Sequence, residues 1–380
     1  MPGAATLPDS ASILSAGADR LRAQLAVAAE ELVRLGLIGV AARIDLPGLP
    51  EPLEIARGYQ DMERSAPLTG TELFAIASQS KMFTAAMVLR LANDGVIALN
   101  DPVARYVGGI PAVDETATIE QFLNHTSGIG NFVRAMPTLP YPWPRMSYDD
   151  LMALARIQGR QFPAGARLDY NNTDVVVLAR LCELVAGEPM SDLLRRYLFA
   201  PLAMNDTYVA AGADWPRTRM ARGYYLPSQG YDGPPIDVTT LPDFSIASAA
   251  GNVVSSLPDM LRWARSLLDS GASTGISITN VAASVAESRD LEPSWFFPRA
   301  YGRGVERWPW AGRAFWGHRG SFFGYHSGTF LDPLSGGAFS MFATMCTTGS
   351  FMRFLELQAH DYMSFMESCA HAIVSLTDMP

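Results

Sequence analysis

The segment from residue 73 to residue 93 reads LFAIASQSKMFTAAMVLRLAN. From Gln79 to Asn93 the residues are apolar on nearly every side of a helical wheel, and Asp94-Gly95 then ends the pattern. A helix that is apolar all round is buried in a core. The sequence therefore predicts a buried helix with Ser78 at its N-terminus, where unpaired backbone N–H groups and the helix dipole favour negative charge.

Lys81 is the only lysine of the chain, and the other 28 of the 29 basic residues are arginine. It follows Ser78 by one helical turn and lies on the same face. A serine hydroxyl is a weak nucleophile that needs a base beside it, and burial lowers the pKa of a lysine so that it can be that base. Arginine does not lose its proton in proteins. A chance Ser-x-x-Lys on an exposed turn is the alternative, but the solitary lysine and the buried helix favour a nucleophile and its base.

A second candidate element is Tyr170-Asn171-Asn172, just before a predicted helix. A nearby lysine ammonium lowers the pKa of a phenol, so we expect Tyr170 to exchange a proton with Ser78 and later with the leaving group. The amide of Asn172 is expected to orient Lys81 or the substrate carbonyl. Taken alone this pattern is weak, because helix N-termini often carry asparagine.

The third candidate element is His318-Arg319-Gly320-Ser321, between strand-like segments around Trp316 and Tyr325. Gly320 has no Cβ, so we expect the strand to leave room for a substrate backbone. The backbone N–H of Ser321, together with that of Ser78, is expected to form an oxyanion hole. His318 on its own is equally consistent with an ordinary strand histidine.

These three elements, in this order, resemble the motifs of the serine β-lactamase and penicillin-binding protein superfamily. The family motifs are Ser-x-x-Lys, Tyr-x-Asn and Lys-Thr-Gly, and the last is often present as His-x-Gly. Two further stretches match, LNHTSGI at residues 123–129 and AAGNVVSS at residues 249–256, and the resemblance covers about residues 20–350. It implies an acyl-enzyme on Ser78, no metal or cofactor, and an active site between two domains.

The expected fold class is α/β plus all-α, similar to β-lactamases and transpeptidases, with an antiparallel sheet flanked by helices and an inserted helical domain. We expect residues 1–98 and 250–380 to form the discontinuous α/β domain and residues 99–249 the mostly helical insertion. Helices are predicted over residues 13–36, 79–93, 148–158, 173–187, 190–199, 257–270 and 351–376. Strands are predicted over residues 37–46, 53–59, 302–308, 314–317, 325–331 and 338–345.

One departure from the β-lactamase pattern concerns function. His318 stands where β-lactamases and transpeptidases keep a lysine that helps to hold a substrate carboxylate. His-x-Gly resembles the esterase, D-aminopeptidase, D-amino-acid amidase and acyltransferase branch, although Arg319 remains available to meet a carboxylate. We therefore expect a serine hydrolase of small ester or amide substrates. The alternatives are an acyltransferase with the same acyl-enzyme, a β-lactamase or D-stereospecific peptidase, and a non-catalytic ligand-binding relative.

Composition restricts the partners. The chain has 380 residues, of which 48% are hydrophobic and 18% charged, which is typical of a folded protein. Its net charge of −9, without basic runs, argues against nucleic acid and against an anionic membrane surface. No run of about 20 apolar residues is present, so no membrane-spanning helix is predicted. The sequence does not indicate an oligomeric state.

The cysteines and the first residues carry weaker signals. Cys182, Cys346 and Cys369 are odd in number and lack paired spacing, so they predict neither a disulfide framework nor a zinc site. Residues 1–19 lack a basic region followed by a continuous apolar run. We therefore expect no secretory signal and a cytoplasmic location.

Three other features of the sequence carry weaker functional signals. The Gly-x-Ser-x-Gly at residues 271–275 follows a helix rather than a strand, so we interpret it as a loop. His125 is expected to be structural rather than catalytic. Several aromatic residues are expected in loops near the cleft, although about half of them fit a plain core equally well: Phe132, Tyr141, Trp143, Trp295, Phe296, Phe322 and Phe323.

Overall fold

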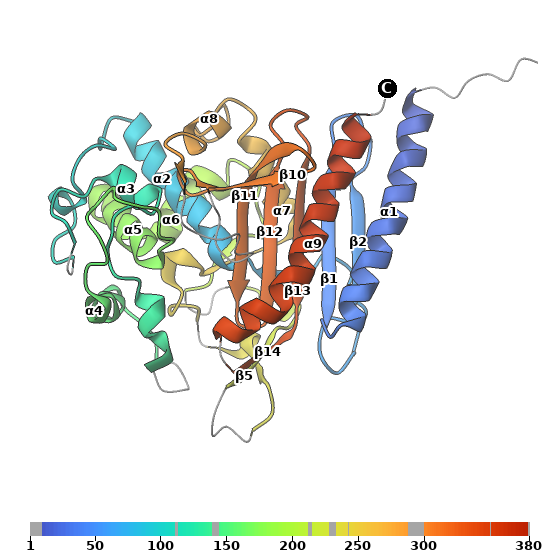
Figure 1. The fold of residues 1–380 in the computed structure, drawn as a ribbon, viewed down its shortest axis with the longest axis horizontal. Coiled ribbons are helices and arrows are strands. Elements are labelled where there is room, and N and C mark those ends of the chain that lie inside the picture. Colours follow the sequence, from blue (N-terminus) through green and yellow to red (C-terminus); the bar gives the residue numbers. More distant parts are fainter. Residues whose placement is uncertain are drawn as a thin grey trace, which may run out of the picture.

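An eight-stranded antiparallel sheet runs through the part of the chain that the computed structural model describes, in the order β2-β1-β13-β12-β11-β10-β9-β8 (Figure 1). The structure describes residues 10–110, 113–138, 144–211, 215–227, 233–241, 243–287, 300–349 and 351–378. The strands are β1 (Gly39–Asp45), β2 (Leu53–Gly58), β8 (Ala286–Glu287), β9 (Ala300–Tyr301), β10 (Glu306–Trp310), β11 (Arg313–Phe322), β12 (Tyr325–Leu331) and β13 (Ala338–Thr344).

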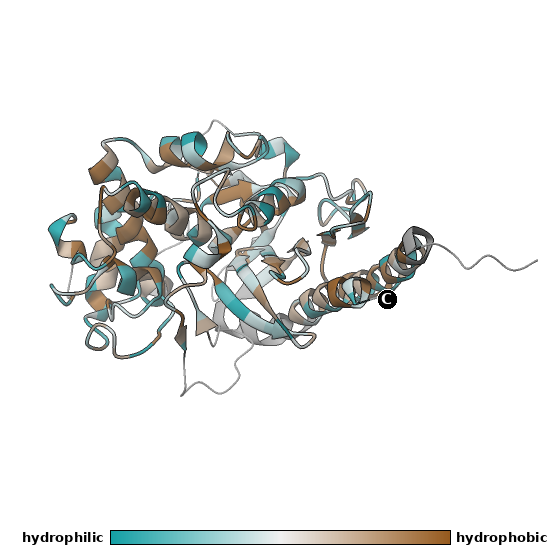
Figure 2. Cartoon of the chain, turned by 90° about the horizontal axis from the view of Figure 1, so that it is seen from above, coloured by the Kyte–Doolittle hydropathy of each residue, from teal (hydrophilic) through white to brown (hydrophobic). Residues whose placement is uncertain are grey.

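Helices cover both faces of this sheet, because its central strands are apolar on both sides. In β13 every residue is buried, and Phe339 and Met341 join one apolar cluster while Phe342 joins the other. The two long helices α1 (Ser10–Arg34) and α9 (Phe351–Thr377) lie against one another on one face (Figures 1 and 2). The short helix α7 (Leu257–Ser266) packs on β12 and β13 from the other face.

The predicted buried helix is confirmed as α2 (Ser80–Asn93), whose residues from Ser80 to Leu89 are all buried. Phe83 packs edge-on against Trp263 at a ring-centroid distance of 5.1 Å. α2 also packs against α5. The remaining helices are α3 (Ile119–Leu123), α4 (Tyr148–Gln158), α5 (Asn172–Ala186), α6 (Met190–Leu194) and α8 (Ile278–Val281).

Residues 99–249 supply helices α3 to α6, on the side of the molecule away from α1 and α9 (Figure 1). They also supply three short strands, β4 (Tyr208–Val209), β5 (Tyr224–Pro227) and β6 (Ile236–Asp237). β4 pairs with β7 (Val253–Ser255), and β5 pairs with β14 (Cys346–Gly349), so this part of the chain is tied to the rest by backbone hydrogen bonds. The division into two domains stays a prediction.

Strand β11 is longer than predicted. The sequence predicts a strand over residues 314–317, whereas β11 continues through His318 to Phe322. Glycines weaken strand propensity, but here they allow close approach: a Cβ on Gly317 would lie 1.9 Å from the Thr329 carbonyl oxygen. The His318–Ser321 element therefore lies within a strand rather than between two.

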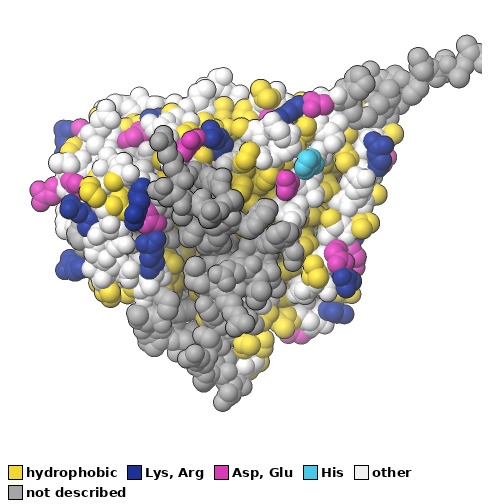
Figure 3. Space-filling view, in the orientation of Figure 1, with side chains coloured by type: hydrophobic (Ala, Val, Ile, Leu, Met, Phe, Trp, Pro, Cys, Tyr) yellow, Lys and Arg dark blue, Asp and Glu magenta, His cyan; other side chains and the backbone are white. Residues whose placement is uncertain are grey.

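The surface shows mixed charge. In Figure 3, Lys and Arg side chains lie near Asp and Glu side chains at several places on the face shown. Surface ion pairs among the described residues include Arg219–Asp206 and Arg307–Glu287. In the described ranges, no helix combines the length and the apolar character that a membrane crossing requires.

His326 is a buried titratable residue of the sheet. It lies in β12 and stacks on Tyr362 of α9, with ring centroids 4.2 Å apart. Burial, helped by the charge of Arg319, lowers the pKa of His326 to about 3. Between this value and the unfolded value of about 6.5, His326 binds a proton in the unfolded chain but not in the folded chain.

We predict that the free energy of unfolding falls as the pH drops from about 6.5 towards 3, and that His326→Phe reduces this slope by about 1.4 kcal/mol per pH unit. Phenylalanine keeps a ring against Tyr362 and removes the proton site. Urea unfolding at pH 7, 6 and 5 measures the slope. His371→Gln, at an exposed position of α9, is the control and should keep the wild-type slope. An unchanged slope in His326→Phe would contradict the prediction.

Candidate active site

Ser78 lies in a tight turn between strand β3 (Phe74–Ala75) and α2. The preceding residue, Ala77, has a φ of +51°, a left-handed conformation that is strained for a residue with a side chain. The hydroxyl of Ser80 donates to the Ala77 carbonyl at 2.7 Å and accepts from the Val253 N–H at 3.1 Å. The third residue of the Ser-x-x-Lys motif thus fixes the turn that presents the nucleophile.

Lys81 is 1% exposed, and its Nζ lies 2.9 Å from Ser78 Oγ and 2.8 Å from the Ala250 carbonyl oxygen. Burial lowers the pKa of Lys81 well below its ordinary value, and the charge of Glu306 opposes this only in part. A neutral amine fits these contacts, because it donates to the carbonyl and accepts the Ser78 proton. Lys81 is therefore placed to act as the base for Ser78.

Tyr170 lies beside Lys81, with the centre of its ring 5.0 Å from Nζ. Burial raises the pKa of Tyr170 above its ordinary value, and a hydrogen bond with Ser78 acts in the opposite direction. The expected lowering of this pKa is wrong, because both side chains are buried and Lys81 itself favours the neutral form. At neutral pH the phenol keeps its proton, so Tyr170 is suited to donate one.

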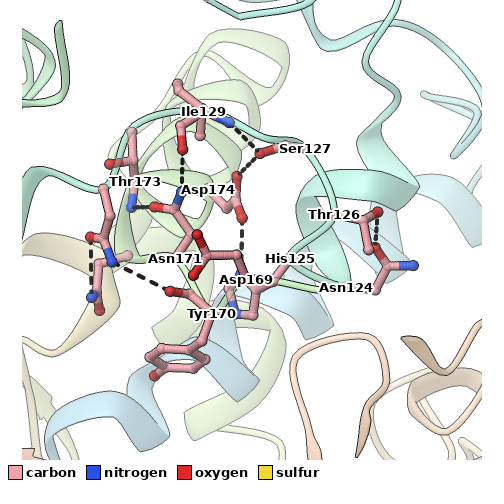
Figure 4. A network of polar contacts seen from close by, with 12 residues as sticks. Asn124, His125, Thr126, Ser127, Ile129, Asp169, Tyr170, Asn171, Thr173 and Asp174 are labelled. Carbon is pink, nitrogen blue, oxygen red and sulfur yellow. Dashed lines mark hydrogen bonds and ion pairs between the residues drawn. The ribbon is translucent and has the colours of Figure 1, made fainter. Parts of the chain in front are cut away.

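The segment that carries Tyr170 is held by asparagines. Asn171 caps α5 by accepting from the Thr173 N–H and donates to the Ile129 carbonyl at 2.6 Å (Figure 4). Asn172 donates to Asn131 at 3.5 Å. The Ala250 carbonyl, rather than Asn172, holds Lys81, and a role of Asn172 towards the substrate carbonyl stays a prediction.

Strand β11 brings the third element to the nucleophile. β10 pairs with β11 only as far as Gly317, so the edge of β11 beyond this residue faces the turn around Ser78. A Cβ on Gly320 would lie 2.1 Å from the Ile76 carbonyl oxygen. Gly320 therefore makes room for the chain's own turn, and the expectation that it also makes room for a substrate backbone stays a prediction. Ser321 follows on the same strand, and its part in an oxyanion hole stays a prediction.

His318 is 1% exposed and has a partner at each ring nitrogen. Nδ1 contacts the Arg319 carbonyl oxygen, and Nε2 lies 3.0 Å from the hydroxyl of Tyr301. Burial lowers the pKa of His318 to about 4, although the charge of Glu306 opposes this shift. His318 is therefore uncharged at neutral pH, accepts a hydrogen bond from Tyr301, and does not replace the charge of a lysine.

Arg319 does not supply a positive charge to the substrate either. Its side chain is buried, with Nε 2.8 Å from Glu306 Oε2, and its guanidinium lies 4.5 Å from the ring centroid of Trp308. The suggestion that Arg319 meets a substrate carboxylate is corrected, because its charge is already paired inside the protein.

Sequence reasoning missed the residues that complete the site through long-range contacts. Tyr301 and Glu306 come from β9 and β10 and carry no recognisable motif, whereas the Ala250 carbonyl lies in the AAGNVVSS stretch that resembles the family. Of the aromatic residues expected near the cleft, Phe132, Phe322 and Phe323 are buried in the core. The other four lie outside the described residues: Tyr141, Trp143, Trp295 and Phe296.

Known proteins share this architecture. A D-amino acid amidase from Ochrobactrum anthropi SV3 aligns over 94% of this chain and 99% of its own, with a TM-score of 0.81 and 27% identity. Penicillin-binding protein 4 from Amycolatopsis lactamdurans is 28% identical over 296 residues, which cover 74% of this chain and 75% of that protein. An unguisins hydrolase from Aspergillus violaceofuscus is 27% identical over 305 residues, or 73% of this chain, and the match spans 53% of the fungal protein.

These likenesses confirm the predicted fold class, an antiparallel sheet with flanking helices and a helical region similar to β-lactamases and transpeptidases. They also agree with the resemblance that the ordered motifs indicate. The family described as Beta-lactamase matches residues 23–354, and the chain belongs to this family of serine hydrolases.

Proposed function

We propose that the protein hydrolyses small amide or ester substrates through an acyl-enzyme on Ser78. The observation that carries the proposal is the contact of 2.9 Å between Ser78 Oγ and Nζ of Lys81, a buried lysine that is the only one in the chain. An arginine in this place would supply charge but no base.

In the proposed reaction, Ser78 Oγ attacks the substrate carbonyl carbon while its proton passes to Lys81. The carbonyl oxygen becomes an oxyanion, which the N–H groups of Ser78 and Ser321 would stabilise. The leaving amine or alcohol takes a proton from Tyr170, and Lys81 then gives its proton to the Tyr170 phenolate, so that both residues regain their resting protonation states in the acyl-enzyme. Water then attacks the acyl group, and the same residues move protons in the reverse order.

The charges around the site argue against a carboxylate-bearing β-lactam as the preferred substrate. His318 is neutral, and the charge of Arg319 is paired with Glu306, so neither supplies a free cation to such a carboxylate. A β-lactamase activity is therefore expected to be weak. Transfer of the acyl group to an alcohol or amine in place of water remains the alternative outcome of the same chemistry.

Relatives support amides as the first substrates to examine. The amidase from Ochrobactrum anthropi matches this chain over nearly its full length. We therefore propose D-amino-acid amides with apolar side chains as the first class to test, with short esters as the second. The cytoplasmic location stays a prediction.

We predict that Ser78→Ala abolishes both substrate turnover and covalent labelling by a fluorophosphonate, because the nucleophilic oxygen is removed while the buried turn keeps its shape. Intact-mass spectrometry detects the adduct. Ser273→Ala is the matched control, since Ser273 lies in the exposed loop with the Gly-x-Ser-x-Gly pattern and should not alter labelling. An adduct on the Ser78→Ala protein would show that another residue is the nucleophile.

We also predict that kcat/KM for D-phenylalanine amide or a short p-nitrophenyl ester exceeds that for nitrocefin by at least about tenfold. The physical reason is the absence of an unpaired cation on His318 or Arg319, since one charge-assisted hydrogen bond contributes roughly 1.5–3 kcal/mol. Initial rates on one enzyme preparation give the ratio. Equal or better turnover of nitrocefin would contradict this interpretation of the site.

A further inference from the structure

His125 and Asp174 form a buried pair of titratable side chains near Lys81, and the proposed reaction does not use this pair. His125 Nδ1 lies 2.9 Å from Asp174 Oδ2, and the Ser127 hydroxyl donates to Asp174 Oδ1 (Figure 4). Both members of the pair are at most 1% exposed. His125 also has a φ of +59°, and such strain persists where surrounding contacts determine the conformation, often at functional sites.

The second nitrogen of this histidine is not engaged by Asp174. Nε2 of His125 is buried and has no hydrogen-bond partner among the described residues. His125 lines a small cavity together with Lys81, Thr84 and Tyr301, and apolar residues of α2, α3 and α5 form most of the remaining wall. The cavity offers about 10 Å³ to the centre of a water-sized sphere, which is close to the space that one water needs.

We propose that His125 is a positioning residue for Lys81: held by Asp174 through Nδ1–H, it presents the Nε2 lone pair to the cavity and accepts, through one water, a hydrogen bond from Lys81. This inference rests on the proposed acyl-enzyme at Ser78. It gives a positioning role to a residue that the sequence predicts to be structural rather than catalytic.

Lys81 has one N–H group more than its described acceptors in either charge state. A neutral Lys81 has two N–H groups, of which one donates to the Ala250 carbonyl, and its lone pair accepts the Ser78 proton. Once it has taken that proton it has three N–H groups, of which two have the Ala250 and Ser78 oxygens as acceptors. The remaining N–H needs an acceptor in a buried place, and the cavity side of His125 provides one. A hydrogen bond from an ammonium is stronger than one from an amine, so the contact strengthens as acylation proceeds, which raises kcat rather than substrate affinity.

The charges around the pair support an accepting, uncharged His125. Burial lowers the pKa of His125 well below its ordinary value. Burial, with a smaller contribution from the charge of Asp169, raises the pKa of Asp174 well above its ordinary value, and the hydrogen bond from Ser127 opposes this shift only in part. The other titratable or charged groups that face Lys81 and His125 are Tyr170, Tyr301, Glu306, His318 and Arg319.

The test is the rate of Ser78 labelling by a fluorophosphonate between pH 5 and pH 9, in the wild type and in His125→Asn. Asparagine tolerates the left-handed backbone and keeps a donor to Asp174, but it lacks Nε2. Asp174→Asn is the second variant, because its amide would donate to Nδ1 and leave an N–H on Nε2. Thr126→Ala is the control, since it removes a buried hydroxyl next to His125 that donates to Asn124 and leaves the His125–Asp174 and Ser127–Asp174 contacts in place.

We expect the maximal labelling rate to fall at least about tenfold in His125→Asn and in Asp174→Asn. The acidic limb of the profile should move to lower pH, because an ammonium that loses an acceptor gives up its proton more readily. Thr126→Ala should keep the position of the acidic limb, with a labelling rate within about threefold of wild type. Rates within threefold of wild type in either variant that folds, or a lower rate with an unmoved limb, would overturn the proposal. A wild type that is not labelled at Ser78 would instead overturn the proposed function.

Discussion

The side chain of Lys81 ends in a nitrogen that the fold has removed from water. A charged ammonium in such a place costs several kcal/mol unless it is paired, so the uncharged amine is favoured. The Ala250 carbonyl that it contacts leaves its lone pair available for the Ser78 proton. Around this nitrogen the structure places the buried helix α2, the ring of Tyr170 and two buried histidines, His125 and His318.

The backbone near the nucleophile is as constrained as the side chains. Ala77 adopts a left-handed conformation, and Gly320 brings strand β11 against the Ile76 carbonyl. A second contact joins the same elements, because the Ser327 hydroxyl donates to that carbonyl at 2.9 Å. These contacts fix Ser78 relative to the edge of the sheet, which is where an oxyanion would need its N–H donors. A side chain at position 320 would separate the two.

Local patterns predicted much of this arrangement. The helix of residues 80–93 follows from a segment that is apolar on nearly every side, and strand β12 follows from its strand-like pattern. The single lysine of the sequence indicates Ser78 as the nucleophile. The full length of β11 was missed, because its glycines serve contacts with distant backbone that no local pattern encodes.

The electrostatics were harder to predict. The pKa of Tyr170 moves opposite to expectation, since the prediction assumed a charged lysine whereas burial acts on both groups. The sequence predicts that Arg319 is available to bind a substrate carboxylate. The fold instead brings Glu306, 13 residues earlier in the chain, within hydrogen-bond distance of Arg319. Burial and long-range ion pairing depend on the whole fold. A sequence motif therefore predicts which residues form a site but not their protonation states.

The central claim is that Lys81 is a neutral base in the resting protein. Because it is the only lysine, protein labelled with [ε-13C]lysine gives one side-chain NMR signal, and its titration reports the pKa of Lys81 directly. The account predicts a midpoint well below the ordinary value of about 10.4, with the signal of the neutral form at mildly alkaline pH. A midpoint at or above 10.4 would show that Lys81 stays charged, and would contradict its role as the base.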